Sequence, residues 1–108
     1  MKDDAIVTRG SGNIFADLGV PDAEEHLLKA QLVLALTKLV EDQGLSQTAA
    51  AARMGIAQPD LSKILRGRFS GFSLERLLNM VRALGNDVEI SVRPVRAARE
   101  GRLKLKVA

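Results

Sequence analysis

A single glycine between two short helical patterns places the tightest constraint on the fold of this chain. Within Leu45–Arg68, apolar residues recur at helical spacing on both sides of Gly55. Glycine adopts a positive φ at little cost, so the chain can turn sharply at this point. Ala51 is small enough to let the following helix approach closely. The stretch predicts two short helices, Gln47–Met54 and Gln58–Leu65, packed together across a tight turn.

The residues of this helical pair separate into an apolar seam and a polar face. The expected seam consists of Ala50, Met54, Ile56, Leu61 and Ile64. The remaining face of the second helix carries Gln58, Asp60, Ser62, Lys63 and Arg66. A rigid helix with a polar outer face suits the major groove of B-DNA, where Gln can pair with adenine and Lys can reach guanine. We therefore expect four residues at base edges: Gln58, Pro59, Ser62 and Lys63.

Phosphate contacts are expected at both ends of the pair. Gln47 begins the first helix, where its amide and the free backbone N–H groups can meet a phosphate. Arg66 and Arg68 flank the end of the second helix and are expected to bind phosphates too. Ala57 stands where a capping side chain would be useful, and Asp60 can partly compensate through the helix dipole.

The other elements complete an all-α domain. Aromatic residues make up only 3% of the chain, so the core must consist of aliphatic side chains and Met, which favours packed helices. One helix is expected to begin at Asp22, which forms a capping box with Glu25, and to end at Gly44. Another is expected to begin after its Ser73 cap and to end at Gly85. We divide the chain into a flexible arm (1–12), a DNA-binding domain (13–93) and a basic tail (94–108).

After Gly85 the apolar period changes from helical to alternating. Val88, Ile90 and Val92 alternate with polar residues, which predicts a half-buried strand over 87–93. A lone strand leaves its hydrogen bonds unmade. Pairing with the same strand of a second copy would satisfy them and give a twofold homodimer. The alternative is an extended tail that lies on its own body.

These motifs resemble the helix-turn-helix of the Cro/C1 (XRE) repressor family. The resemblance rests on positions within 46–67: Ser46, Gln47, Ala51, Gly55, Ile56, Leu61, Ser62, Ile64 and Gly67. It implies a λ-repressor-like bundle of four to five helices. Asn13–Gly19, Ser70–Leu77 and Leu84–Ile90 further resemble HigA-type antitoxins, which implies an autoregulating homodimeric repressor. The alternative implied function is neutralisation of a RelE/HigB-like toxin, with DNA binding secondary.

No enzymatic site is expected. The chain has no Cys, and its single His, His26, lacks companions for a metal site, so we expect neither cofactor nor metal. Ser70–Ser73 is better explained as a turn and helix cap, with Phe72 packing into the core, than as a nucleophile or phosphate loop. The lack of cysteine, signal peptide and membrane span favours a cytoplasmic protein.

Charge is distributed unevenly along the chain. Residues 1–43 carry four basic and eight acidic side chains, whereas residues 44–108 carry twelve basic and five acidic ones. A cationic half suggests a surface that binds a polyanion. The basic tail leaves three interpretations open: a nonspecific DNA arm, a solvated end, or a toxin-binding segment.

Overall fold

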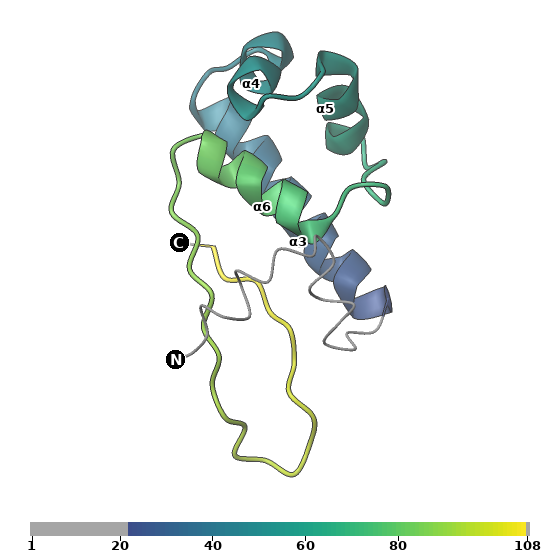
Figure 1. Cartoon of the computed structure of the whole chain (residues 1–108), viewed down its shortest axis with the longest axis vertical. Helices are drawn as coiled ribbons and strands as arrows, with labels where there is room; N and C mark the ends of the chain where they lie inside the picture. Colours follow the sequence, from purple (N-terminus) through teal and green to yellow (C-terminus); the bar gives the residue numbers. More distant parts are fainter. Residues whose placement is uncertain (1–21, 108) are drawn as a thin grey trace.

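The computed structural model describes residues 22–107, and the expected features of residues 1–21 lie outside them. Four helices follow one another in the described part of the chain: α3 (Asp22–Asp42), α4 (Gln47–Met54), α5 (Gln58–Leu65) and α6 (Leu74–Ala83) (Figure 1). The bounds of α4 and α5 are those expected from the sequence. The prediction of an all-α helix-turn-helix bundle is confirmed for this part of the chain.

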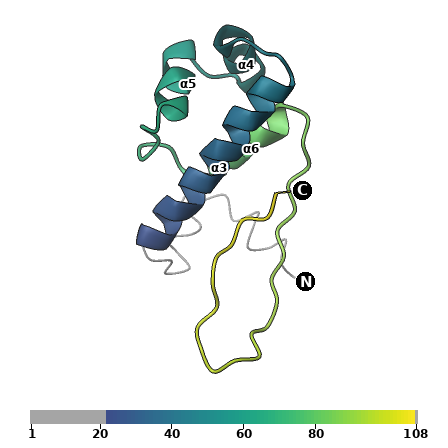
Figure 2. The ribbon, with the colours of Figure 1, turned by 180° about the vertical axis from the view of Figure 1, so that it is seen from behind.

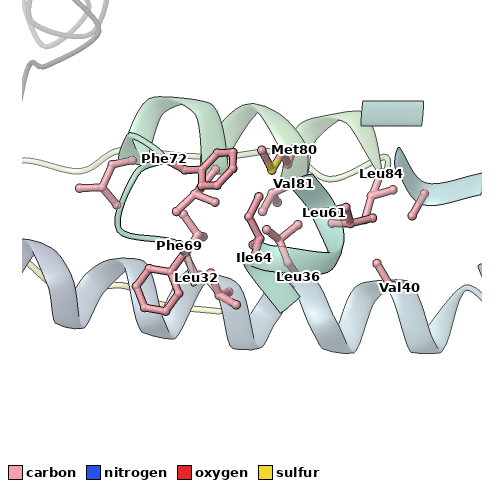
Figure 3. Close-up of a cluster of buried hydrophobic side chains, with 14 of the residues drawn as sticks. Leu32, Leu36, Val40, Leu61, Ile64, Phe69, Phe72, Met80, Val81 and Leu84 are labelled. Carbon is pink, nitrogen blue, oxygen red and sulfur yellow. The ribbon is translucent and has the colours of Figure 1, made fainter. Parts of the chain in front are cut away.

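The core lies where buried side chains of α3, α5 and α6 meet. Figures 1 and 2 show α6 beside α3, with α4 and α5 together at one end of the molecule. Aliphatic residues line the contact, and the most deeply buried of them are Leu36, Leu61, Ile64 and Leu77. Phe69 and Phe72, from the loop that joins α5 to α6, lie at one end of this cluster (Figure 3). The core is therefore not built from aliphatic side chains and Met alone, as the low aromatic content had led us to expect, because two of the three Phe residues are buried in it. The expected insertion of Phe72 into the core is confirmed, since its exposed fraction is 7%.

Local capping explains where the helices begin and end. The Ser46 hydroxyl accepts a hydrogen bond from the Ala49 N–H at 3.1 Å, and Ser73 does the same for Arg76 at 3.1 Å. Gly55 ends α4 in the left-handed region with φ of 70°. Ala57 makes no side-chain cap at α5, as its residue type implies.

The expected strand over 87–93 is not present in the single chain. Residues 86–107 run as two extended limbs that leave α6 and return toward α3 (Figures 1 and 2), and no strand is assigned between residues 22 and 107. Alternating side chains favour an extended backbone, but a ladder needs a second strand at hydrogen-bonding distance. The first limb therefore has the extended conformation that the alternation favours without the pairing that defines a strand.

Two side chains of α3 have surroundings that the sequence did not indicate. Lys29 is buried, with its Nζ atom 3.5 Å from a Glu25 carboxylate oxygen and 3.4 Å from the Ser70 carbonyl oxygen. His26 is exposed, and its ring stacks on Phe69 with the centroids 5.1 Å apart. No group of three or more His, Cys, Asp or Glu residues within 22–107 is arranged to hold a metal. None of the described helices has the length and apolarity that a membrane span requires.

Candidate nucleic-acid interface

The outer face of α5 is the candidate interface because its sequence divides sharply between core and solvent. Leu61 and Ile64 have exposed fractions of 0% and fix the inner face of the helix. Gln58, Pro59 and Lys63 are exposed, and Ser62 is partly exposed. The structure thus brings the four expected base-reading residues together on the side of α5 that is turned away from the core.

The geometry between α4 and α5 depends on the turn at Gly55. The Ile56 N–H donates to the Ala51 carbonyl at 3.1 Å, which closes α4 with a bond that spans the turn. Ala50 and Ala51 are buried at the contact, with exposed fractions of 0% and 2%. Their small side chains let α4 and α5 approach closely.

A hydrogen bond joins the first residues of the two helices. The Gln58 Nε2 group donates to Gln47 Oε1 at 3.0 Å, and both residues are exposed. The bond uses one Nε2 hydrogen of Gln58, so the second Nε2 hydrogen and the Oε1 oxygen are not engaged in this contact. The sequence singled out both residues, but their direct contact depends on the packing of α4 against α5.

A hydrogen-bond network ties the far end of α4 to α3 and α6. The Gln43 amide donates to the Leu84 carbonyl at 2.8 Å and accepts from Arg53 Nη1 at 3.3 Å. Gln43 follows α3, Arg53 lies on α4 and Leu84 follows α6. This network was not expected from the sequence, because its partners lie far apart in the chain.

The basic residues at the end of α5 border the same surface. Arg66 and Arg68 are both exposed. The Arg68 N–H donates to the Lys63 carbonyl at 2.9 Å, while Gly67 adopts φ of 93°, so the chain reverses directly after the helix. The Arg66 Nε group donates to the Ser62 carbonyl at 3.3 Å, which holds this guanidinium against the last turn of α5. The expected phosphate-binding residue Gln47 lies at the opposite end of the face, at the start of α4.

Comparison with known proteins matches this geometry to an existing family. A family model described as a helix-turn-helix domain matches residues 14–93. A solved structure described as a member of the XRE family of transcriptional regulators is 43% identical in sequence, with a TM-score of 0.77. The match covers 82% of this chain and 100% of that one. The chain belongs to the XRE family.

This XRE-family protein therefore carries a helix-turn-helix DNA-binding domain, with α4 and α5 as its two defining helices. Among curated proteins, none matches the chain. The family assignment agrees with the expected class of protein, a regulator that binds DNA.

Proposed function

We propose that this protein is a sequence-specific transcriptional repressor that binds operator DNA as a homodimer. The observation that carries the proposal is a hydrogen bond from Gln58, on the exposed face of α5, to Gln47 at the start of α4. A Gln side chain recognises adenine by accepting from its N6 amino group and donating to N7. Gln58 retains the groups for both bonds while Gln47 holds its amide in place, so the pair is prepared for such a contact before DNA binds.

The other contacts follow from positions around Gln58. Lys63 lies five residues further along the exposed face, where its ammonium can reach guanine acceptors in the same groove. The Ser62 hydroxyl can donate to or accept from a base edge, and Pro59 offers an apolar contact to a thymine methyl group. Gln47, Arg66 and Arg68 would bind phosphates on either side and fix the register of the helix.

Homodimer formation is supported by the unpaired limb after α6. Ile90 and Val92 have exposed fractions of 48% and 64%. Between Asp87 and Val95 no backbone–backbone hydrogen bond to another described residue is formed. A second copy that pairs its own limb here would bury these side chains and satisfy the backbone. The twofold pairing would also present two α5 helices to successive half-sites.

The dimer is tested by measuring molar mass in solution. Ile90→Asp with Val92→Asp places charge in the proposed pair and should give a monomer. Ser91→Asp is the matched control, because its side chain lies on the other face of an extended limb, and it should leave the dimer intact. A parent protein that is monomeric at concentrations where it binds DNA would contradict the proposal.

Operator binding is tested by selecting duplexes from a random pool with the full chain. We expect a palindromic consensus, because a twofold dimer reads two inverted half-sites. In a shift assay on the selected duplex, Gln58→Ala and Lys63→Ala should each weaken binding by about 1–3 kcal/mol. Unchanged binding by both variants would show that α5 is not the reading helix.

A toxin-neutralising role is a second candidate, and two exposed leucines on one face of α3 favour it. Leu27 and Leu34 have exposed fractions of 58% and 71%, and their spacing of two turns puts them on one side of the helix. Exposed leucines on one face suit a protein partner. If a small RelE-like protein is encoded beside this chain, co-expression should recover a complex that Leu27→Asp with Leu34→Asp abolishes, whereas Asn79→Asp, which places the same charge at an exposed position of α6, should not. Failure of the parent to retain that neighbour would exclude this role.

A further inference from the structure

The most strongly charged segment outside the α4–α5 surface is the basic arm, defined here as residues 93–106. It contains one acidic residue, Glu100, and six basic ones: Arg93, Arg96, Arg99, Arg102, Lys104 and Lys106. All six basic side chains are exposed. The two salt bridges found among the described residues both lie within α3. No described carboxylate forms a salt bridge with the arm, so its positive charge faces solvent.

The arm is attached to the body at its base and projects at its turn. The Leu103 N–H donates to a Glu24 carboxylate oxygen at 3.2 Å, and Leu103 and Leu105 pack against the core cluster. The two limbs meet near the turn, where a methyl group on Gly101 would lie 3.9 Å from the Val95 side chain. The arm therefore projects from the body of the protein, and its second limb is held to α3 and to the core cluster.

The turn of the arm lies at the opposite end of the molecule from α4 and α5. Figures 1 and 2 share the vertical axis along which the molecule is longest, and both show this separation. The longest extent of the chain is 46 Å, and α3 and α6 occupy the space between the two ends. A duplex seated on the outer face of α5 would consequently be beyond the reach of the arginines at the turn.

The residue types of the arm favour duplex phosphates over other partners. Four of its six basic residues are Arg, whose planar guanidinium can hold a phosphate with two parallel hydrogen bonds. It contains no aromatic residue, so it offers no stacking platform for unpaired bases. The same absence removes Trp and Tyr, two of the three residue types most enriched in the hot spots of protein–protein interfaces. Binding by charge alone is typical of contacts that do not depend on base sequence.

We propose that the basic arm is a second, sequence-independent DNA-binding element, which contacts a duplex segment other than the one bound by α5. One protein molecule would thereby link two stretches of DNA. The proposal rests on the proposed function only in assigning the operator to α5. Its polyanion contact can be measured whether or not an operator exists.

The first test measures binding to a short mixed-sequence duplex as salt is varied. The arm variant replaces Arg96, Arg99, Arg102 and Lys104 with Gln, all of which lie outside the limb proposed to pair in the dimer. The control replaces two exposed basic residues outside the arm, Lys38→Gln and Arg82→Gln. Each phosphate contact contributes about 0.9 to the slope of log affinity against log salt, so removal of four contacts should lower that slope by up to about 3.6. The control should lose less for each charge removed. Equal losses per charge would overturn the proposal and leave an acidic protein surface as the class of ligand to test.

The second test asks whether two duplexes are held at once. The duplex selected from the random pool is immobilised, the full chain is bound, and a labelled mixed-sequence duplex is added. The parent should capture the label, and the arm variant should capture at least tenfold less while binding the immobilised duplex equally. Unchanged capture of the labelled duplex by the arm variant would overturn the proposal. So would a loss of binding to the immobilised duplex as large as the loss of capture, because the arm would then contact the operator itself. If no duplex is selected from the pool, the proposed function fails. The salt titration of the arm variant and its control is then repeated with Gln58→Ala and Lys63→Ala added to every protein, and it still decides the role of the arm.

Discussion

The side-chain amide of Gln58 donates a hydrogen bond to that of Gln47 across 3.0 Å, which links the first residue of α5 to the first residue of α4. One residue is proposed to recognise a base and the other a phosphate. Their contact means that the reading side chain is oriented by the residue that sets the register on the backbone. Coupling between these two roles is therefore expected.

Gln47→Ala should weaken binding to the selected duplex and relax the preference at the position read by Gln58. It removes a phosphate contact and also the acceptor that orients the Gln58 amide. In a double-mutant cycle, Gln47→Ala and Gln58→Ala should show a coupling of about 0.5–3 kcal/mol, because the two side chains share a hydrogen bond. Titration of the four proteins with the selected duplex measures this coupling. Strictly additive losses would show that the residues act independently on DNA.

Arg66→Ala and Arg68→Ala should weaken binding to every sequence by a similar factor. Each substitution removes one expected phosphate contact, which lowers the salt slope by about 0.9. Titrations of the selected duplex and of a mixed-sequence duplex at several salt concentrations provide the comparison. A loss confined to the selected duplex would instead assign these arginines to base recognition.

Gly55→Ala tests how the turn between α4 and α5 is maintained. A Cβ at this position would have no heavy atom within 4 Å, so the cost comes from the backbone, whose φ is 70°. We expect a loss of about 1 kcal/mol in the free energy of unfolding, as for other L-residues forced into the left-handed region. Gly55→Asn should cost less, because Asn tolerates this conformation better. Urea unfolding distinguishes the two, and equal stability of Gly55→Ala and the parent would contradict the argument.

Leu61→Ala should destabilise the domain by about 2–5 kcal/mol, because it leaves a cavity beneath the proposed reading face. Leu61 has an exposed fraction of 0% and belongs to the same helix as Lys63. Lys63→Ala is the matched control and should change stability by no more than about 0.5 kcal/mol. Unfolding curves of both variants separate the inner face of α5 from its outer face. A large destabilisation by Lys63→Ala would show that this side chain supports the fold.

The sequence was sufficient to predict the elements whose ends are determined locally. Ser46, Gly55 and Ser73 act within one turn of their own position, which is why the bounds of α4 and α5 agree with the expectation and α6 differs only slightly. Leu61 and Ile64 were assigned to the core from helical period alone. The family resemblance over residues 46–67 likewise depends only on residue types at fixed spacing in the sequence.

Features that depend on distant partners could not be predicted in the same way. The expected strand over 87–93 needs a second strand, and an alternating pattern does not say where that strand comes from. The Gln43 bond to Leu84 and the burial of Lys29 beside Ser70 each join residues 41 positions apart. The contact between Gln47 and Gln58 depends on how closely α4 packs on α5. The sequence therefore predicts the residues of the proposed site but not the bond that links two of them.

The central claim is that the outer face of α5 recognises bases. The most direct measurement is a parallel selection of duplexes from one random pool with the parent and with Gln58→Ala. The account predicts a palindromic consensus for the parent and loss of one symmetric pair of base preferences, with the rest retained, for the variant. Identical consensus sequences from the two proteins would contradict it.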